Sequence, residues 1–481
     1  MMDRSQFETV IGLEVHVELK TKTKIFCSCP TTFGAEPNTQ CCPVCLGLPG
    51  AMPTLNRRVV ELAILAGLAL DCDIPHGSRI DRKQYFYPDL PKAYQISQAN
   101  SPICRAGHLD IDTPAGTRRI GITRIHIEED AGKLVHTPTH TRIDCNRCGV
   151  PLIEIVSEPD LRSPEEAVAY LKALRAVLVT CGISDCKMQE GSMRCDINLS
   201  VRRRGEESFG VRAEIKNVNS FAYAEKAMRY EEKRQIDMLL KGQEILPETR
   251  RYDEATETTV CMRVKEKADD YRYLNEPDLM PIRISDEDIA RMLIRLPELP
   301  RARASRMQAA YGISLADAKI LCADAALANY FEHVVTYTTF PKLALNLLLS
   351  DLLHHATAES FSSPVEASRL GELANLVGEG TINSSTAKKL LLRLVQADFS
   401  LRAAIEAEGL AQIRDESILA AVVQEVLTEQ ARAVADYKKG KRAAAQVLMG
   451  NIMKKTGGRA DPILADRILQ KELNREEASH V

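Results

Sequence analysis

Apolar and polar residues alternate with a period of two near the start of the chain, which predicts a β-strand over residues 10–19. The apolar face of this strand carries Ile11, Leu13, Val15, Val17 and Leu19. The polar face carries Glu14, His16 and Glu18. Two carboxylates beside an imidazole can bind a divalent cation, although an exposed amphipathic strand has the same pattern.

Acids recur on four further strand-like segments of the first half of the chain, at residues 120–130, 152–158, 189–200 and 212–217. Glu154 lies inside an apolar run, where a carboxylate needs a partner or a metal because its burial is costly. Five such strands predict a sheet with one face lined by carboxylates and interspersed Arg and Lys. Such a face suits Mg²⁺ and a polyphosphate.

Two helices are predicted in the same part of the chain. Ser163 to Glu166 has the pattern of a capping box, with Pro164 at the first helical position, and the helix should end at Gly182. A second helix is predicted over residues 221–240, closed by Gly242.

The composition changes near residues 297–300. Most prolines and short β-like runs precede this point, whereas the later sequence is rich in Ala, Leu, Glu, Lys and Arg, with helical periodicity over residues 316–327 and 387–394. We expect an α+β domain over residues 1–296, an all-helical domain over 297–407 and a small helical tail domain over 408–481.

Length and charge limit the alternatives. A chain of 481 residues with net charge −3 is no bulk polycation, so any nucleic-acid surface must be local. No apolar run approaches the roughly 20 residues of a membrane span, and residues 1–6 contain no signal-peptide pattern, so we expect a cytoplasmic protein.

The cysteines are concentrated in the first half of the chain, since all 14 except Cys322 lie at or before Cys261. The spacing of one group is typical of a zinc knuckle that binds the metal with four thiolates, with reduced buried thiols as the alternative: Cys27, Cys29, Cys42 and Cys45. Cys145 and Cys148 form a second CxxC motif without a nearby partner pair, and we expect free thiols there.

The tail is locally basic and interrupted by glycines. Its candidate phosphate contacts are Lys438, Lys439, Lys441, Arg442, Lys454, Lys455 and Arg459. A solvated helix face is the alternative. Without a zinc-finger, RRM or KH signature, RNA shape and backbone are the expected targets.

Familiar catalytic motifs are missing from the sequence. It contains no Walker A motif, no kinase catalytic loop and no G-x-S-x-G elbow. A nucleotide would therefore be held through metals and basic side chains on the sheet. The sequence also lacks a Gly/Ser-rich amidase-like stretch that could release ammonia from an amide.

Six motifs together resemble the family of B subunits of the aminoacyl-tRNA amidotransferases, at residues 11–16, 33–38, 81–92, 126–133, 151–159 and 269–273. The resemblance covers essentially the whole chain, and Gln84 stands where the family has Asn. It implies an antiparallel-sheet, cradle-like catalytic domain, a helical domain and a tail that contacts tRNA. It also implies a heterotrimer with an amidase-type A subunit and a small C subunit.

The resemblance implies a reaction as well. The B subunit uses ATP and Mg²⁺ to phosphorylate the side-chain carboxylate of misacylated Glu-tRNA(Gln) or Asp-tRNA(Asn), and ammonia from the A subunit then displaces phosphate. The expected metal-holding catalytic residues are Glu14, His16, Glu129 and Glu154. Glu190 and Asp196 are further candidate ligands. The candidate phosphate contacts are Arg194, Lys216 and Lys83.

Some interpretations stay open on the sequence alone. Tyr85, Phe86 and Tyr87 could stack on the acceptor end of tRNA, but we expect them to be core residues of a turn before Pro88. A free-standing kinase or ligase for a small carboxylate would not need the basic tail. A non-catalytic tRNA-binding scaffold would leave the repeated acids unexplained.

Overall fold

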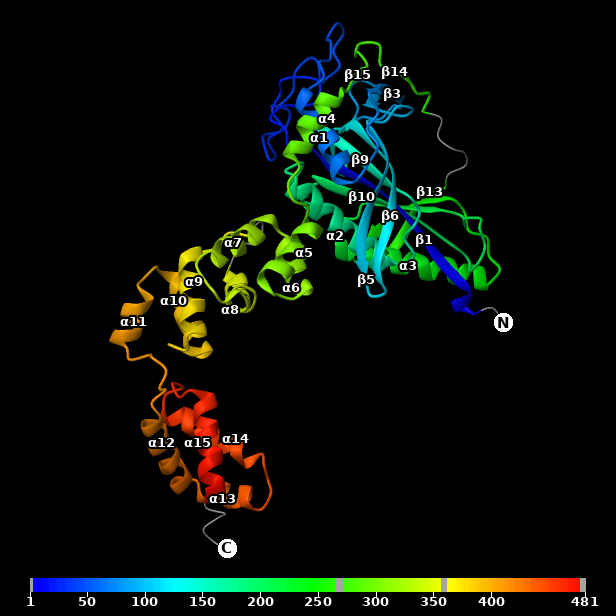
Figure 1. Cartoon of the computed structure of the whole chain (residues 1–481). Helices are drawn as coiled ribbons and strands as arrows, with labels where there is room; N and C mark the ends of the chain where they lie inside the picture. Colours follow the sequence, from blue (N-terminus) through cyan, green and yellow to red (C-terminus); the bar gives the residue numbers. More distant parts are fainter. Residues whose placement is uncertain (1–2, 265–270, 356–360, 476–481) are drawn as a thin grey trace. The chain divides into compact units, whose positions relative to one another are not determined.

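Eight strands between residues 7 and 264 form one sheet (Figure 1). Its strand order is β13 (Thr258–Val264), β12 (Glu248–Asp253), β11 (Ala213–Lys216), β10 (Met193–Arg203), β1 (Phe7–Glu18), β9 (Pro151–Ser157), β6 (Gly116–Glu129) and β5 (Cys104–Thr113). All neighbouring pairs are antiparallel except β11 and β12. The computed structural model describes residues 3–264, 271–355 and 361–475, so Asp269 and Asp270 of the last family motif lie outside the described residues.

One face of the sheet is covered by helices α1 (Arg57–Ala69), α2 (Pro164–Thr180) and α3 (Phe221–Leu240). The odd-numbered apolar residues of β1 are buried with residues of these helices in one continuous core, as the period-two pattern predicts. The even-numbered residues Glu14, His16 and Glu18 point to the opposite face, which we call the polar face.

The two helices predicted in this half are confirmed. Ser163 accepts the backbone N–H of Glu166 at the start of α2, and α3 spans the predicted residues. The capping box predicted at Ser163 to Glu166 is only half formed, because the Glu166 carboxylate does not accept the backbone N–H of Ser163. This carboxylate accepts the backbone N–H of Arg162 instead and pairs with Arg118. Gly182 and Gly242 follow the helices with positive φ, which glycine adopts without steric cost.

Short elements surround the main sheet. Strands β14 (Leu274–Asn275), β3 (Asp81–Gln84) and β4 (Tyr94–Ser97) form one small sheet, and β15 (Ile282–Arg283) pairs with β2 (Gly77–Ser78). Strands β7 (Lys133–His136) and β8 (Thr141–Asp144) form a hairpin. The remaining elements are the 3₁₀-helix η1 (Arg4–Gln6) and helix α4 (Asp286–Arg295), which packs against α1.

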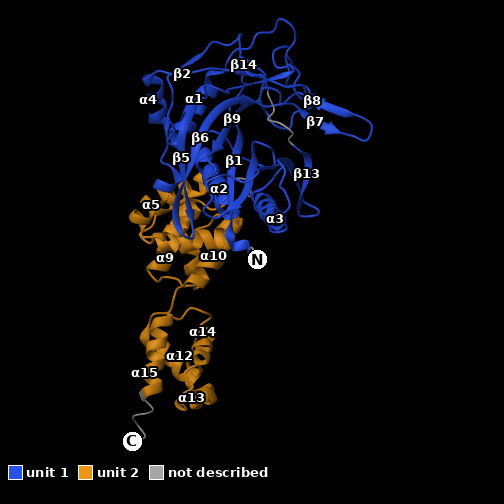
Figure 2. Ribbon diagram, turned by 90° about the vertical axis from the view of Figure 1, so that its right-hand side faces the viewer, with its two compact units in different colours: residues 1–302 blue, residues 303–481 orange. Residues whose placement is uncertain are grey.

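The chain divides into two compact units, residues 1–302 and 303–481 (Figure 2). Helix α5 (Pro300–Tyr311) crosses this division. The first apolar cluster of the second unit lies between Ala304 and Ile405. Its elements are α6 (Leu315–Cys322), α7 (Ala325–Val335), α8 (Pro341–Leu347), the π-helical turn η2 (Leu348–Leu352), η3 (Leu353–His355), α9 (Ala367–Gly378), α10 (Ser384–Gln396) and α11 (Leu401–Ala407).

A separate apolar cluster, between Leu419 and Leu473, is formed by α12 (Glu416–Glu429), α13 (Ala431–Lys438), α14 (Ala444–Lys455) and α15 (Pro462–Arg475). The domain boundaries expected after residues 296 and 407 remain predictions.

The structure bears out the α+β class. The stretch with helical periodicity at residues 316–327 belongs to two helices, because Asp324 accepts the backbone N–H groups of Ala326 and Leu327 and starts a new helix, α7. None of the helices in the described ranges combines the length and hydrophobicity needed to cross a bilayer.

Candidate active site

The register of the central strands brings acids and imidazoles together on the polar face. His16 on β1 lies opposite Glu154 on β9, and Glu154 lies opposite His126 on β6. Glu14, one step along the same face of β1, lies opposite Asp196 on β10. Residues far apart in the sequence therefore form rows across the sheet.

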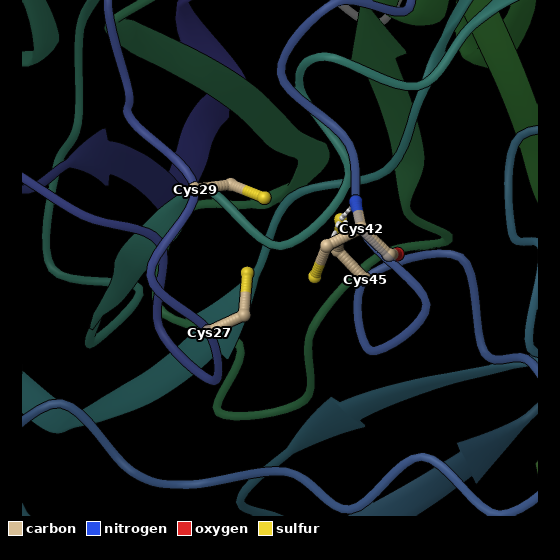
Figure 3. A group of neighbouring side chains, drawn as sticks. All are labelled: Cys27, Cys29, Cys42 and Cys45. Atoms are coloured by element: carbon tan, nitrogen blue, oxygen red, sulfur yellow. Dashed lines mark hydrogen bonds between the residues drawn. The ribbon is translucent and has the colours of Figure 1, made fainter.

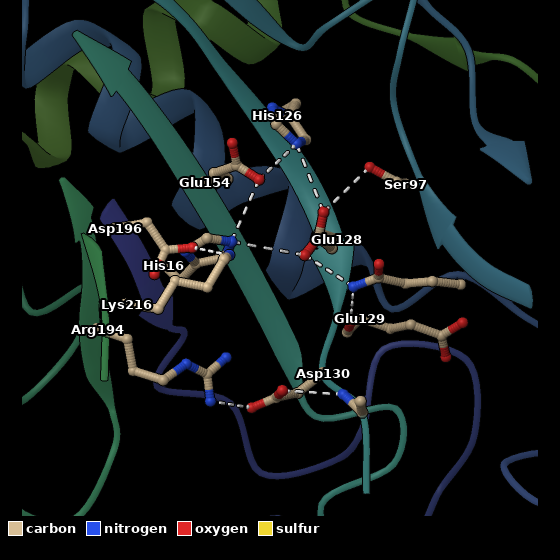
Figure 4. Close-up of polar contacts among 12 residues, drawn as sticks. His16, Ser97, His126, Glu128, Glu129, Asp130, Glu154, Arg194, Asp196 and Lys216 are labelled. Atoms are coloured by element: carbon tan, nitrogen blue, oxygen red, sulfur yellow. Dashed lines mark hydrogen bonds and ion pairs between the residues drawn. The ribbon is translucent and has the colours of Figure 1, made fainter. Parts of the chain in front are cut away.

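Four of these side chains form a compact cluster, which we call the His/Glu cluster: His16, His126, Glu128 and Glu154 (Figure 4). Nε2 of His16 and Nε2 of His126 each lie 3.3 Å from Oε2 of Glu154. The same two nitrogens lie 3.9 and 3.6 Å from the carboxylate oxygens of Glu128. Gln95 and Ser97 also donate to Glu128, at 2.7 and 3.2 Å.

The electrostatics of the cluster favour charged forms despite its burial. Burial alone would lower the pKa of His126, but the carboxylates of Glu154 and Glu128 outweigh it and raise this pKa to about 9. The pKa of His16 is raised by the same balance. Burial opposes ionisation of Glu154 as well, but the two histidines hold its pKa well below the ordinary value. Without a metal, the two carboxylates therefore favour the protonated form of both imidazoles, and the imidazoles favour the ionised form of Glu154.

A second group of acids adjoins the first on the polar face. Carboxylate oxygens of Glu14, Asp196 and Glu214 lie within 4.8 Å of one another. Nζ of Lys216 lies 2.5 Å from Asp196 and 3.1 Å from Glu214, and Asn198 donates to Glu14 at 2.9 Å. Burial, and then the charge of Glu154, raise the pKa of Glu14. This group, the three-acid group, has more carboxylates than nearby cations.

Arginines lie at the end of the same face. Arg194 donates to Asp130 at 2.7 Å, and Nε of Arg147 lies 3.5 Å from the same carboxylate. Burial and the neighbouring Asp130 raise the pKa of Glu18 to about 8, so this carboxyl keeps its proton near neutral pH. The predicted phosphate contact Arg194 is therefore held in an ion pair.

Two of the expected metal ligands lie elsewhere. Glu129 is adjacent to Glu128 on β6 and points away from the His/Glu cluster. Its carboxylate pairs with Lys92 and accepts the backbone N–H of Ile96 at 2.8 Å. Glu190 lies in the turn before β10 and pairs with Lys187 at 2.8 Å. Glu14, His16, Glu154 and Asp196 do lie together on the polar face.

Sequence reasoning missed three residues of the site, namely His126, Glu128 and Glu214. The buried Ile125 and Ile127 flank His126 on β6, so strand alternation places His126 and Glu128 together on the polar face. That alternation was the available signal for both residues. Glu214 lay within a segment already identified as acidic, and its pairing opposite Asn198 brings it to the site.

Lys83 on β3 stands beside aromatic rings. Its ammonium lies 4.8 Å from the ring centre of Tyr271 and 5.8 Å from that of Tyr85. Burial would lower its pKa, but the charge of Glu128 leads a set of interactions that raise it. The expectation of a buried turn is wrong for Phe86 and Tyr87, which are 76% and 55% exposed.

The sulfur atoms of Cys27, Cys29, Cys42 and Cys45 lie within 4.8 Å of one another, in the arrangement predicted from their spacing (Figure 3). The hydrogen bond from Cys27 lowers the pKa of Cys45 to about 4, and the Lys24 ammonium adds to this effect. Cys145 and Cys148 lie outside this four-cysteine site, and neither forms a disulfide.

The basic residues of the tail lie at the ends of α13 and α14 and in the turns that follow. Several already have partners. Lys455 pairs with Glu425 and Glu429 at 2.5 and 2.6 Å, Lys441 pairs with Asp436 at 3.2 Å, and Arg459 donates to the carbonyl of Gly409 at 2.7 Å. Lys438, Lys439, Arg442 and Lys454 are also exposed.

Comparisons with known proteins point to one family along most of the chain. Residues 9–290 match the GatB/GatE catalytic domain, and residues 329–473 match the GatB domain. The B subunit of the aspartyl/glutamyl-tRNA(Asn/Gln) amidotransferase from Caldicellulosiruptor saccharolyticus is 48% identical over 478 residues, covering 98% of this chain and 100% of the relative. The protein of the same name from Clostridium tetani is 47% identical over 473 residues, covering 98% and 99%.

Proposed function

The chain belongs to the GatB/GatE family, and from this premise we propose that it is the B subunit of a tRNA-dependent amidotransferase. It uses ATP to phosphorylate the side-chain carboxylate of Glu-tRNA(Gln) or Asp-tRNA(Asn). A carboxylate is a poor acyl donor, and phosphorylation converts one oxygen into part of a leaving group. Ammonia then displaces phosphate and gives Gln-tRNA(Gln) or Asn-tRNA(Asn). An amidase-type A subunit supplies the ammonia, and a small C subunit completes the heterotrimer.

The observation that carries this proposal is the pairing of two ligand groups on one sheet face. One is His16, Glu128 and Glu154, and the other is the three-acid group, and in each the ligand atoms lie within 4.8 Å of one another. Lys216 and Arg194 border them. Phosphoryl transfer needs this combination of cation sites and basic side chains, because charge must be stabilised on several phosphate oxygens.

The three-acid group fits Mg²⁺. Its donors are carboxylate oxygens, which Mg²⁺ prefers, and they lie within 4.8 Å of one another. A bound Mg²⁺ would neutralise charge on the phosphates of ATP. The mixed set of His16, Glu128 and Glu154 also suits Mn²⁺, because imidazole is a better ligand for that metal.

The basic side chains orient the phosphates in this proposal. Arg194 and Lys216 are already paired with Asp130 and Asp196, so a phosphate must share these cations with the carboxylates. Lys83 is the best placed of the three predicted contacts. Among the described residues no carboxylate lies within ion-pair distance of it, and the rings of Tyr271 and Tyr85 hold its ammonium.

Two further parts of the chain have supporting roles in the proposal. The four-cysteine site holds a structural Zn²⁺, for which four thiolates are a typical ligand set. The exposed basic residues at the ends of α13 and α14 contact tRNA phosphates.

The test is a half-reaction without ammonia. The chain is assembled with its A and C partners, γ-labelled ATP, Mg²⁺ and Glu-tRNA(Gln), with no ammonia source. Labelled phosphate should appear on the aminoacyl-tRNA and be lost in Glu14→Gln and Glu154→Gln. Glu190→Gln is the matched control, because Glu190 is paired with Lys187 away from both groups, and it should retain the label.

Two outcomes would overturn the proposal. Label transfer to free glutamate or aspartate without tRNA would identify a ligase for small carboxylates. If the parent chain and Glu154→Gln both bind tRNA tightly and neither transfers the label, the chain is a non-catalytic scaffold.

A further inference from the structure

Lys24 is a fully buried lysine, with 0% of its surface exposed. Its ammonium has two polar neighbours, Sγ of Cys45 at 3.6 Å and the backbone carbonyl of Cys145 at 3.3 Å. Among the residues that the structure describes, no carboxylate lies within ion-pair distance of this ammonium. An isolated buried charge costs several kcal/mol, roughly, so the site around Lys24 must supply negative charge.

The four-cysteine site is the nearest source of that charge. Cys45 is one of its members and is itself buried. Four thiolates around a divalent metal carry a net charge of about −2, which is costly to hold in a site where Cys45 is buried and the other three cysteines are partly buried. Each charge thus offsets the burial cost of the other.

The second lysine of this region is already engaged. Lys92 lines the same cavity as Lys24, Cys27 and Cys45, but its ammonium pairs with both carboxylate oxygens of Glu129. Its charge is therefore balanced by Glu129. Of the two lysines, Lys24 is therefore the one whose charge is available to the four-cysteine site.

The backbone fixes Lys24 in this position. Its N–H donates to the carbonyl of Cys29 at 2.9 Å, and the N–H of Ile25 donates to the carbonyl of Gly149 at 2.9 Å. Asn56 donates to the carbonyl of Lys24 at 3.4 Å. The loop that carries the cysteines and the loop at residues 145–149 therefore close around one ammonium.

We propose that Lys24 is a built-in counter-cation of the four-cysteine site, which allows a divalent metal to be held by four thiolates in a partly buried position. Lys24 is a positioning residue in this role, because it contacts a ligand and not the metal. The inference rests on the zinc site of the proposed function and is independent of the amidation reaction.

The experiment measures metal retention by the full-length chain. Zinc content is determined first, and the rate of zinc transfer to a chromogenic chelator is then compared between the parent, Lys24→Met and Lys22→Met. Methionine keeps the unbranched stem and removes the charge. Lys22, two residues away, is exposed, so it is the matched control. We expect about one zinc per parent chain, release at least tenfold faster from Lys24→Met, and an unchanged rate from Lys22→Met.

A second variant separates charge from packing. Cys29→His replaces one thiolate by a neutral imidazole and lowers the negative charge of the site by one. The double variant Lys24→Met/Cys29→His restores the net charge of the parent, so it should fold and release zinc more slowly than Lys24→Met, even if Lys24→Met itself aggregates.

The possible failures are distinguishable. A parent chain without zinc would overturn the zinc assignment and this inference with it. A zinc-containing parent whose release rate is unaffected by Lys24→Met would overturn the inference alone. A double variant that releases zinc as fast as, or faster than, Lys24→Met would also overturn it.

Discussion

Replacing Glu154 by glutamine should lower the pKa of His126. Burial is the largest single influence on His126 and lowers its pKa, while Glu154 is the largest influence that raises it, ahead of Glu128. With Glu154 neutral, Glu128 is the main group left to oppose burial, so the pKa should fall from about 9 toward its ordinary value of 6.5. A fall of this size corresponds to about 3 kcal/mol of interaction between the imidazolium and Glu154.

The assay is a histidine NMR titration of the full chain in buffer without Mg²⁺ or Mn²⁺. The chain is labelled with ¹³C at histidine Cε1, and the His126 signal is assigned among the 10 histidines by its absence from His126→Gln. Glu190→Gln is the control and should leave the titration of His126 unchanged. A His126 pKa that stays above 8 in Glu154→Gln would refute the reasoning.

The same balance links pH to stability. A histidine whose folded pKa is raised stabilises the fold fully below its unfolded value of 6.5, and this contribution is lost as the pH rises through about 9. The metal-free parent should therefore lose about 3 kcal/mol of unfolding free energy across this range, relative to His126→Gln, in urea denaturation monitored by circular dichroism. An equal pH dependence of the two proteins would contradict the assignment.

Three further predictions concern parts of the chain outside the His/Glu cluster. Lys92→Met leaves Glu129 buried without its cation, and should lower the unfolding free energy by about 3–5 kcal/mol in urea denaturation. Gly47→Ala should lower the unfolding free energy by about 1 kcal/mol or more, because φ is +66° and the new Cβ would lie 2.3 Å from Cγ of Lys92. Gly50→Ala is the control: φ is also positive there, but the new Cβ meets open space, so the loss should be smaller. The slope of log K for tRNA binding against log salt should fall by about one per residue for alanine substitutions at exposed tail positions, namely Lys439, Arg442 and Lys454.

Local patterns predicted the single elements well. The polar face of β1, the bounds of α3 and the grouping of four cysteines each depend on spacing within one short segment, which the sequence displays directly. The acidic strands were also recognised individually. Their order in the sheet depends on pairing between distant segments, and no local pattern specifies it.

Glu129, which the family resemblance implied as a metal ligand, shows why the site was harder to predict than the elements. The buried residues Ile120 and Ile122 have even numbers, and counting onward from them places Glu129 on the polar face. A register irregularity between Ile122 and Arg124 reverses this alternation. Beyond it Ile125 is buried, so His126 and Glu128 face the site and Glu129 faces Lys92.

The central place of β1 has a consequence for synthesis of the chain. This strand leaves the ribosome before its two neighbours in the sheet, which begin only at Pro151 and Met193. At roughly 5–20 residues per second, β1 waits on the order of ten seconds for both partners. During that time its apolar face and both hydrogen-bonding edges are open to other strands. We therefore expect nascent-chain chaperones to bind residues 7–18, and ribosomes stalled before residue 193 to yield aggregation-prone fragments.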